Sequence, residues 1–362
     1  MFLSCAGKSD SNLETGKNVI QNPEYGSKQN VEPAPFEFEL QESISLQLPE
    51  DFILSGIDYL TTDQNGNYYF MDYAQSKLIS VAPDGSFRWM TGEKGKGPGD
   101  FEDVWGILIQ DNYILVSNIQ STRHDFFDFD GNFIKSISLP KEILYSSIED
   151  VTESGKLIIS SFRMGSFGHN IFIAKLESDS LSILNSFEID ETNGVKIQDR
   201  SSTKSSLNII DDKIITGSLH DYSFSIYNLE GVLIKTIKRS FDKIVRPGMY
   251  ATETSSTLYG FGDTSAPYKI NDELYLATTS WPTNVTDPDQ FTKRVASGID
   301  EKVDFMNSID FFDAKWNLLY SIESEGYDPE FGKIDMVKDG VIFTSSAEPF
   351  PTVYKYKIKT KN

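Results

Sequence analysis

The sequence predicts an all-β fold: a six-bladed β-propeller of four-stranded antiparallel blades, with the last blade closed by an N-terminal strand. Three observations support this prediction. The 362 residues include 25 Phe and 17 Tyr, and aromatic residues fit the half-buried surface of a sheet. Short apolar runs recur in groups of four along most of the chain. The last group has only three runs, and an alternating N-terminal segment supplies the fourth.

Each repeat unit consists of four apolar runs separated by turn residues. In the second unit the runs are WGILIQD, YILVSN, HDFFDF and NFIKSISL, within about 35 residues. Turns such as Asn65-Gly66 and Asp130-Gly131 accept the positive φ of tight hairpins. Four-stranded units at this spacing are typical of propeller blades. The six units are expected at residues 56–91, 105–139, 147–189, 205–241, 266–323 and from about 332 to the end.

The last unit contains only the runs KIDMVKD, GVIFTSS and TVYKYKI. The segment FEFELQESISLQL, residues 36–48, alternates apolar and polar residues and has no other partner in the sequence. We therefore predict that it is the fourth strand of the last blade, which closes the ring and leaves no open sheet edge there. This count favours six blades over five or seven.

The N-terminal region divides into two further segments. The start MFLSCAGKSD resembles the end of a bacterial lipoprotein signal, although the charged region and the apolar stretch of a signal peptide are missing. Residues 1–5 are therefore interpreted as a signal remnant whose Cys5 carries the lipid, the alternative being an incidental free cysteine. Residues 6–35 are rich in small and polar residues and are predicted to form a flexible tether. The propeller is expected to occupy residues 36–362.

The charge limits the possible partners. The formal net charge is −21, so the protein repels phosphate backbones and nucleic-acid binding is not expected. Cys5 is the single cysteine, which rules out an intramolecular disulfide. No run of about 20 apolar residues indicates a membrane-spanning helix.

The long connections are expected on one face of the propeller. Loops between the second and third strands of a blade lie on the same face as connections between blades. The long segments at residues 92–104, 241–266 and 282–306 all belong to these two loop classes. The last includes a predicted helix with Asp287 as N-cap, Pro288 at its first position and an apolar stripe from Phe291 to Val303. Binding sites often lie in such loops, whereas the turns at Asn65, Asp130 and Glu230 belong to the opposite face.

The candidate ligand-binding residues belong to this insertion-bearing face. They are the three histidines with neighbouring cationic and aromatic residues: Arg123, His124, Arg163, His169, His220, Tyr222, Trp281 and Arg294. Tyr73 and Phe350 are further aromatic candidates. Pairing with carboxylates is expected to raise the histidine pKa values, and binding would then change between about pH 5 and 7. The alternative is that these polar loop residues are simply solvated.

Other chemistry has weaker support. The histidines lack a metal-binding spacing, and Asp72, Asn118 and Glu348 fit a metal site only by position at strand ends, so no metal or other cofactor is expected. The loop GKGPGDF, residues 95–101, precedes a strand rather than a helix, which favours a structural connection over a phosphate site. No nucleophile elbow or cysteine nucleophile is visible.

One resemblance concerns nearly the whole chain after residue 36. The GKGPGDF loop, the segment NGNYYFMDY (65–73) and the lipoprotein-like start resemble the six-bladed NHL- and TolB-like propeller lipoproteins common in Bacteroidetes, although Asp100 stands where Glu is usual. The resemblance implies a fold and a location in the cell envelope, at the outer membrane, rather than an activity.

Three functions remain open at this stage. The first is a lipid-anchored binding module for a glycan, a peptide or an envelope protein. The second is a metal-dependent enzyme of the lactonase or lyase type, and the third is a structural subunit of an outer-membrane complex. We favour a binding protein without catalytic residues.

Overall fold

The computed structural model describes most of the chain from residue 18 to residue 361. The residues outside the description are 1–17, 111, 120–121, 144–145, 153, 163–168, 190–205, 219–220, 246–247, 252–255, 260–261, 263, 300, 326–333 and 362. Cys5 and residues 6–17 of the predicted tether are therefore outside the described residues.

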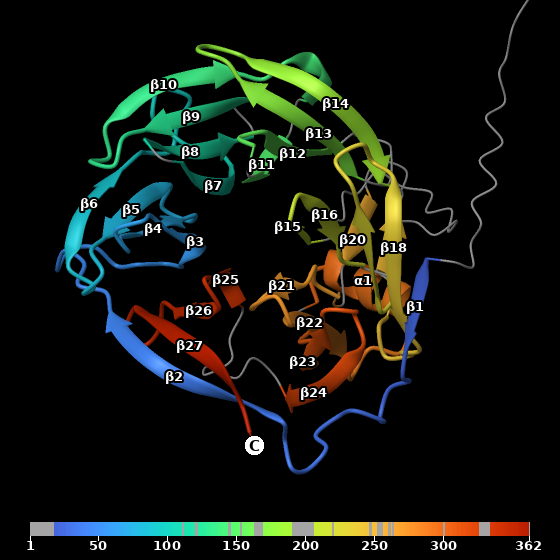
Figure 1. Cartoon of the computed structure of the whole chain (residues 1–362). Coiled ribbons are helices and arrows are strands. Elements are labelled where there is room, and N and C mark those ends of the chain that lie inside the picture. The colour runs from blue at the N-terminus through green and yellow to red at the C-terminus, as the bar shows by residue number, and fades with distance from the viewer. Residues whose placement is uncertain are drawn as a thin grey trace, which may run out of the picture.

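Six four-stranded antiparallel blades surround one axis (Figure 1). The first three blades follow the chain from the inner to the outer strand: β3 (Asp58–Thr62), β4 (Tyr68–Asp72), β5 (Lys77–Val81) and β6 (Phe87–Thr91); β7 (Val104–Gln110), β8 (Tyr113–Asn118), β9 (Arg123–Phe127) and β10 (Phe133–Ser138); β11 (Ser146–Val151), β12 (Leu157–Phe162), β13 (His169–Leu176) and β14 (Leu181–Ile189). A short 3-10 turn, Lys141–Ile143, precedes β11.

The other three blades complete the ring. They are formed by β15 (Leu207–Ile210), β16 (Lys213–Thr216), β17 (Ser223–Tyr227) and β18 (Leu233–Arg239); β21 (Tyr268–Lys269), β22 (Leu274–Pro282), β23 (Phe305–Asp313) and β24 (Leu318–Glu325); β25 (Ile334–Lys338), β26 (Val341–Ser346), β27 (Thr352–Thr360) and β2 (Phe36–Ser45). The predicted fold class and blade count are confirmed.

The predicted closure of the last blade is also confirmed. Strand β2 pairs antiparallel with β27, from Phe36 opposite Thr360 to Ser45 opposite Thr352. Glutamates on β2 face lysines on or just after β27: Lys355 Nζ lies 2.7 Å from Glu42 Oε2, and Lys361 Nζ lies 3.2 Å from Glu37 Oε2. Cross-strand pairs of opposite charge contribute only a few tenths of a kcal/mol each (about 0.2–1), but they favour this register over a slipped one.

The described part of the predicted tether has a structure of its own. Strand β1 (Val19–Asn22) adds in parallel to the outer edge of β18, as a fifth strand of the fourth blade. The chain then follows the outside of the fifth blade, where Asn30 N donates to Ser321 O at 2.9 Å and Ser321 N donates to Lys28 O at 3.0 Å. The prediction of a flexible tether is therefore wrong for residues 18–35, because main-chain pairing to exposed outer strands does not require apolar side chains. We call this segment the strap.

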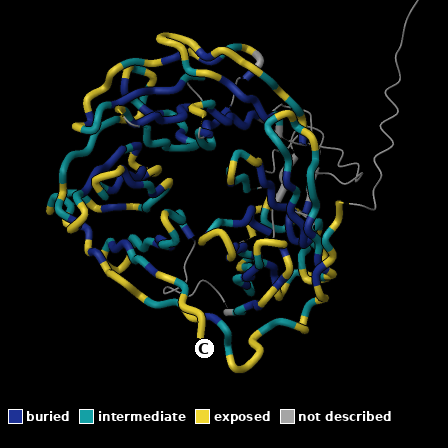
Figure 2. Tube along the Cα trace, in the orientation of Figure 1, coloured by how far each residue is buried: buried dark blue, intermediate teal, exposed yellow. Residues whose placement is uncertain are grey.

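Side chains between neighbouring blades form the core. Tyr69, Phe70 and Met71 of β4 have no exposed surface, and neither do Ile114, Leu115 and Val116 of β8. Figure 2 shows the same distribution, with buried residues along the middle strands and exposed ones at the rim. Adjacent blades cover both faces of β4 and β8, and their sequences, YYFMD and YILVSN, are therefore mostly apolar without alternation.

The two largest insertions pack on each other. The hairpin of β19 (Gly248–Ala251) and β20 (Ser256–Tyr259) contacts helix α1 (Pro288–Ala296). The predicted N-cap is confirmed, since Asp287 Oδ1 accepts a hydrogen bond from Gln290 N at 3.0 Å. The helix is shorter than the predicted apolar stripe: it ends at Ala296, and Gly298 has a φ of +82°. Among the described residues, no helix has the length and apolar character needed to cross a membrane.

Candidate functional site

Among the predicted ligand-binding residues, the side chains that the structure describes are mostly buried or bonded within the chain. Four of them are buried or bonded within the chain, and Arg294 on α1 donates from Nε to Glu301 Oε1 at 2.5 Å. Arg163 and His220 lie outside the described residues, and only the backbone of His169 is described, in β13.

His124 is an interior residue. It is 1% exposed, and it pairs across the sheet with Ser117, whose Oγ accepts from Ile148 N of the next blade. Residues paired in this way share one face of a sheet, so His124 lies at the seam between the second and third blades. Burial lowers its pKa from 6.5 to about 3. The expectation that carboxylates raise the pKa is therefore wrong for this histidine.

Arg123 holds the GKGPGDF loop. Its Nε donates to Asp125 Oδ1 at 2.8 Å, and its guanidinium nitrogens donate to three carbonyls, Lys96 O at 2.8 Å, Gly97 O at 2.7 Å and Asp100 O at 2.9 Å. The loop then places Phe101, 1% exposed, in the core next to Phe127. These contacts support the structural interpretation of the loop, and they use guanidinium donors of Arg123 within the chain.

Tyr222 and Trp281 belong to a buried cluster under the strap. The Tyr222 hydroxyl donates to Asp310 Oδ2 at 2.6 Å, and the Arg239 guanidinium lies over the Tyr222 ring at 5.5 Å. Trp281 is 4% exposed and packs edge-on against Phe241, which also contacts Tyr25 of the strap. These aromatic residues join the fourth blade, the fifth blade and the strap, so they are not available for stacking on a ligand.

A cleft of about 380 Å³ opens at the end of the propeller axis opposite the insertion-bearing face. Its lining comes from the ends of the inner strands of four blades and from adjacent turns: Thr61, Thr62, Asp63, Gln64, Asn65, Leu108, Ile109, Gln110, Phe129, Asp150 and Lys338. Asn65, which the sequence placed on the face opposite to the predicted site, is among these residues. A volume of this size accommodates a small molecule.

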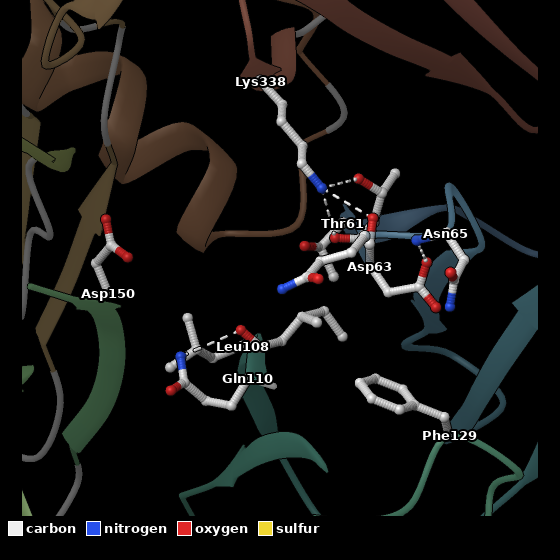
Figure 3. Close-up of a pocket in the computed structure, with 11 residues that line it drawn as sticks. Thr61, Asp63, Asn65, Leu108, Gln110, Phe129, Asp150 and Lys338 are labelled. Carbon is white, nitrogen blue, oxygen red and sulfur yellow. Dashed lines mark hydrogen bonds between the residues drawn. The ribbon is translucent and has the colours of Figure 1, made fainter. Parts of the chain in front are cut away.

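One side of the cleft is a rigid bridge between the sixth and first blades. Lys338 Nζ donates to Asp63 O at 2.9 Å, to Thr62 Oγ1 at 3.0 Å and to Thr62 O at 3.3 Å (Figure 3). An ammonium group has three protons, so these three acceptors satisfy it. Lys338 therefore shapes the cleft and contributes positive charge, but it has no proton left to donate to a ligand.

Asp63 is also committed to structure. Its Oδ1 accepts from Asn65 N at 2.8 Å and from Asn67 N at 2.9 Å, and its Oδ2 accepts from Asn67 Nδ2 and the Tyr69 hydroxyl. These hydrogen bonds lower the pKa of Asp63 despite its burial. The same turn recurs at Asp128 and Asp313 in other blades, which shows that it is a structural element of the repeat.

Asp150 is the ionisable side chain of the cleft with the fewest described partners. It lies across the opening from Lys338 in Figure 3, at the end of β11, and its Oδ1 accepts from Val151 N at 2.7 Å. Burial raises its pKa from 3.8 to about 6, the backbone hydrogen bond lowers it, and the neighbouring Glu149 raises it further. A carboxyl group that titrates near neutral pH in a cleft is a candidate functional residue.

The rest of the lining suits a small polar ligand. Gln64, Asn65 and Gln110 offer amide groups, Thr61 a hydroxyl, and Phe129 and Leu108 an apolar wall (Figure 3). A few polar groups around an apolar wall are typical of small-molecule sites. Among the described residues, no group of three or more His, Cys, Asp or Glu side chains could hold a metal ion. Asn118, considered for a metal site from its position in the sequence, donates to Asp100 O and Asp125 Oδ2.

Comparison with known proteins supports the fold and does not indicate a function. No protein-family model matches the chain, and no curated protein matches it in sequence. Among solved structures, it is similar to a member of the DUF4221 family from Bacteroides vulgatus, with a TM-score of 0.61 and 12% identity over 90% of this chain and 99% of that one. It is also similar to a Bacteroides fragilis protein described as exported, with a TM-score of 0.55 and 12% identity over 95% of this chain and 100% of that one.

Proposed function

We propose that this chain is a binding protein of the bacterial cell envelope that holds a small polar ligand in the cleft, with Asp150 accepting hydrogen bonds from the ligand. The cleft itself carries the proposal: it places a carboxyl group with a pKa of about 6 beside amide groups and an aromatic wall. The ligand class is one that donates hydrogen bonds, namely sugars, which bring several hydroxyl donors and an apolar ring face for Phe129.

The pH dependence of binding tests the role of Asp150. With a pKa of about 6, roughly nine-tenths of the carboxyl groups are ionised at pH 7 and about one-tenth at pH 5. A sugar that donates to the carboxylate should therefore bind about tenfold more weakly at pH 5 than at pH 7. Isothermal titration with a panel of neutral mono- and disaccharides measures this directly.

Matched variants separate the cleft from general effects of charge. Asp150→Ala should abolish the pH dependence and most of the affinity, whereas Asp130→Ala, an exposed carboxylate in a turn on the same face, should change neither. Binding that is equal in both variants, or that strengthens as the pH falls, would reject the proposal.

Export and lipid anchoring are proposed on separate grounds. The start of the sequence supports them through Cys5, and the similarity to a Bacteroides fragilis protein described as exported is consistent with them. Stable attachment requires more than one acyl chain, at about 0.8 kcal/mol per buried methylene, so the effect of losing the anchor should be large. A form with a complete secretory leader should enter the detergent phase of a Triton X-114 separation, and Cys5→Ser should move it to the aqueous phase; an unchanged distribution would exclude the anchor.

A further inference from the structure

The face opposite the cleft exposes large apolar side chains on neighbouring loops of the sixth and first blades. Ile53 is 83% exposed, Phe350 75%, Tyr73 49% and Tyr59 39%. Ile53 lies in the connection between the two blades, Phe350 in the loop between β26 and β27, and Tyr73 in the loop between β4 and β5. Tyr59 lies on the inner strand β3. These four residues define what we call the Phe350–Tyr73 surface.

Hydrogen bonds between the loops hold this surface in one arrangement. Asp72, which has no exposed surface, accepts from Ser55 N at 2.7 Å and from Gln75 N at 3.0 Å. Gln75 Nε2 in turn donates to Ile53 O at 2.5 Å. On the other side, Leu46 N donates to Pro351 O at 2.8 Å, which joins the β26–β27 loop to the same connection.

Two of the aromatic residues of the surface, Tyr73 and Tyr59, are held by their local structure. The Tyr73 hydroxyl donates to Asp103 Oδ1 at 2.7 Å, and the same oxygen accepts from Trp105 Nε1 at 3.0 Å. Tyr59 has a φ of +56° at an irregularity in the pairing of β3 with β4. A bulky residue with positive φ is strained, and such strain is often associated with function. Rigid aromatic anchors lose little entropy when a partner binds.

The loops that carry Ile53, Tyr73 and Phe350 have charge of one sign. Segments 46–58, 72–76 and 347–351 contain the acidic residues Glu50, Asp51, Asp58, Asp72 and Glu348 and no Lys or Arg. Glu50, Asp51 and Glu348 are exposed. The nearest lysine in sequence, Lys77, donates to Gly92 O at 2.6 Å. Like charge disfavours a second copy of this chain, with its net charge of −21, and it also disfavours an anionic membrane.

We propose that the Phe350–Tyr73 surface is a docking site for a basic polypeptide segment that carries apolar side chains. The apolar side chains of the partner pack on Phe350, Ile53 and the Tyr73 ring, and its Lys or Arg residues face Glu50, Asp51 and Glu348. Exposed apolar patches with a polar rim mark interaction sites, and complementary charge increases the rate of association and its specificity. The surface is separate from the cleft, so both can be occupied at once.

The experiment uses two fluorescein-labelled peptides, one composed of Lys, Phe and Gly and the other with Glu in place of every Lys. Fluorescence anisotropy with the full chain should show binding of the Lys peptide alone. Ile53→Ser with Phe350→Ser should weaken that binding about tenfold or more, which corresponds to about 1.4 kcal/mol. Both side chains are more than 70% exposed, so the double variant should keep the melting temperature of the parent.

The control is Leu40→Ser with Leu184→Ser, on the outer strands β2 and β14, where the leucines are 51% and 53% exposed. This variant also leaves the charge unchanged, and its affinity should stay within about twofold of the parent. Glu50→Gln with Glu348→Gln should weaken binding and reduce its salt dependence between about 50 and about 500 mM NaCl.

Three results would overturn the proposal. Equal losses in the two double-serine variants would show that the peptide binds the acidic protein non-specifically. Binding of the parent protein to phosphatidylglycerol vesicles, with loss in Ile53→Ser and no preference for the Lys peptide, would indicate a membrane surface. A concentration-dependent dimer in sedimentation velocity that is lost in Phe350→Ser would indicate a second copy of the chain.

Discussion

Replacing Asp150 with Asn should stabilise the protein, and the gain should depend on pH. The carboxyl pKa is raised from 3.8 to about 6, so the native state binds this proton more tightly than the unfolded state does. Ionisation of Asp150 therefore costs stability above pH 6, and the cost disappears as the pH falls toward 3.8. A shift of about two units corresponds to about 3 kcal/mol.

The substitution isolates this effect because Asn keeps the local hydrogen bond. The amide oxygen of Asn can accept from Val151 N as the carboxylate does, but it carries no charge. Urea unfolding should give a free energy of unfolding for Asp150→Asn that exceeds the parent value by about 3 kcal/mol at pH 8 and by about half of that at pH 5. A difference that is absent at pH 8, or that grows as the pH falls, would refute the assignment of a raised pKa to Asp150.

Three further variants test the fold. Deletion of residues 36–45 removes β2 and exposes the edge of β27, so it should cause unfolding or aggregation in thermal melts, whereas deletion of residues 6–17 should leave the melting temperature unchanged; equal effects would argue against closure. Lys338→Met leaves two carbonyl groups without their donor and should lower the free energy of unfolding by about 2 kcal/mol; an unchanged urea midpoint would show that the bridge does not contribute. Gly217→Ala would place a Cβ 2.0 Å from a main-chain carbonyl oxygen and should lower the free energy of unfolding by about 2 kcal/mol or more. Gly56→Ala, whose Cβ would have its nearest neighbour at 3.4 Å, should change it by less than about 0.5 kcal/mol. Similar urea midpoints for the two variants would contradict the packing at Gly217.

Turn residues and apolar runs were sufficient to predict the blades. The pairs Asn65-Gly66 and Asp130-Gly131 are predicted to form turns, and both glycines have positive φ, 80° and 83°, a conformation that glycine adopts without steric cost. The closing strand followed from counting runs, since a blade of three strands has an open edge. The strap was missed because β1 is held by main-chain hydrogen bonds, and its side chains carry little sign of that pairing.

The candidate site was harder to predict because burial is not visible in residue type. His124, Tyr222 and Trp281 are polar or amphipathic, and the sequence placed them in loops near one face. The structure places all three in seams between blades, at 1%, 1% and 4% exposure. A histidine or tyrosine at the end of a strand can face a neighbouring blade or the solvent, and the local sequence is compatible with either orientation.

The cleft was missed because its residues are far apart in sequence and none of them belongs to a recognisable local motif. Thr62, Gln110, Asp150 and Lys338 come from four blades, at or near the ends of their inner strands. An alignment of the six units would have placed these positions in the same or adjacent columns, and hence at one end of the axis. The raised pKa of Asp150 depends on desolvation by neighbouring blades, which the sequence of β11 does not specify.

Hydrogen–deuterium exchange of the ligand-bound protein tests the central claim most directly. A sugar identified by titration should slow exchange of the backbone amides at residues 61–65, 108–110 and 150–151, which surround the cleft. The amides of the insertion-bearing face, at residues 282–299, should exchange as in the free protein. Protection confined to the insertions, with residues 61–65 unchanged, would contradict the assignment of the ligand site to the cleft.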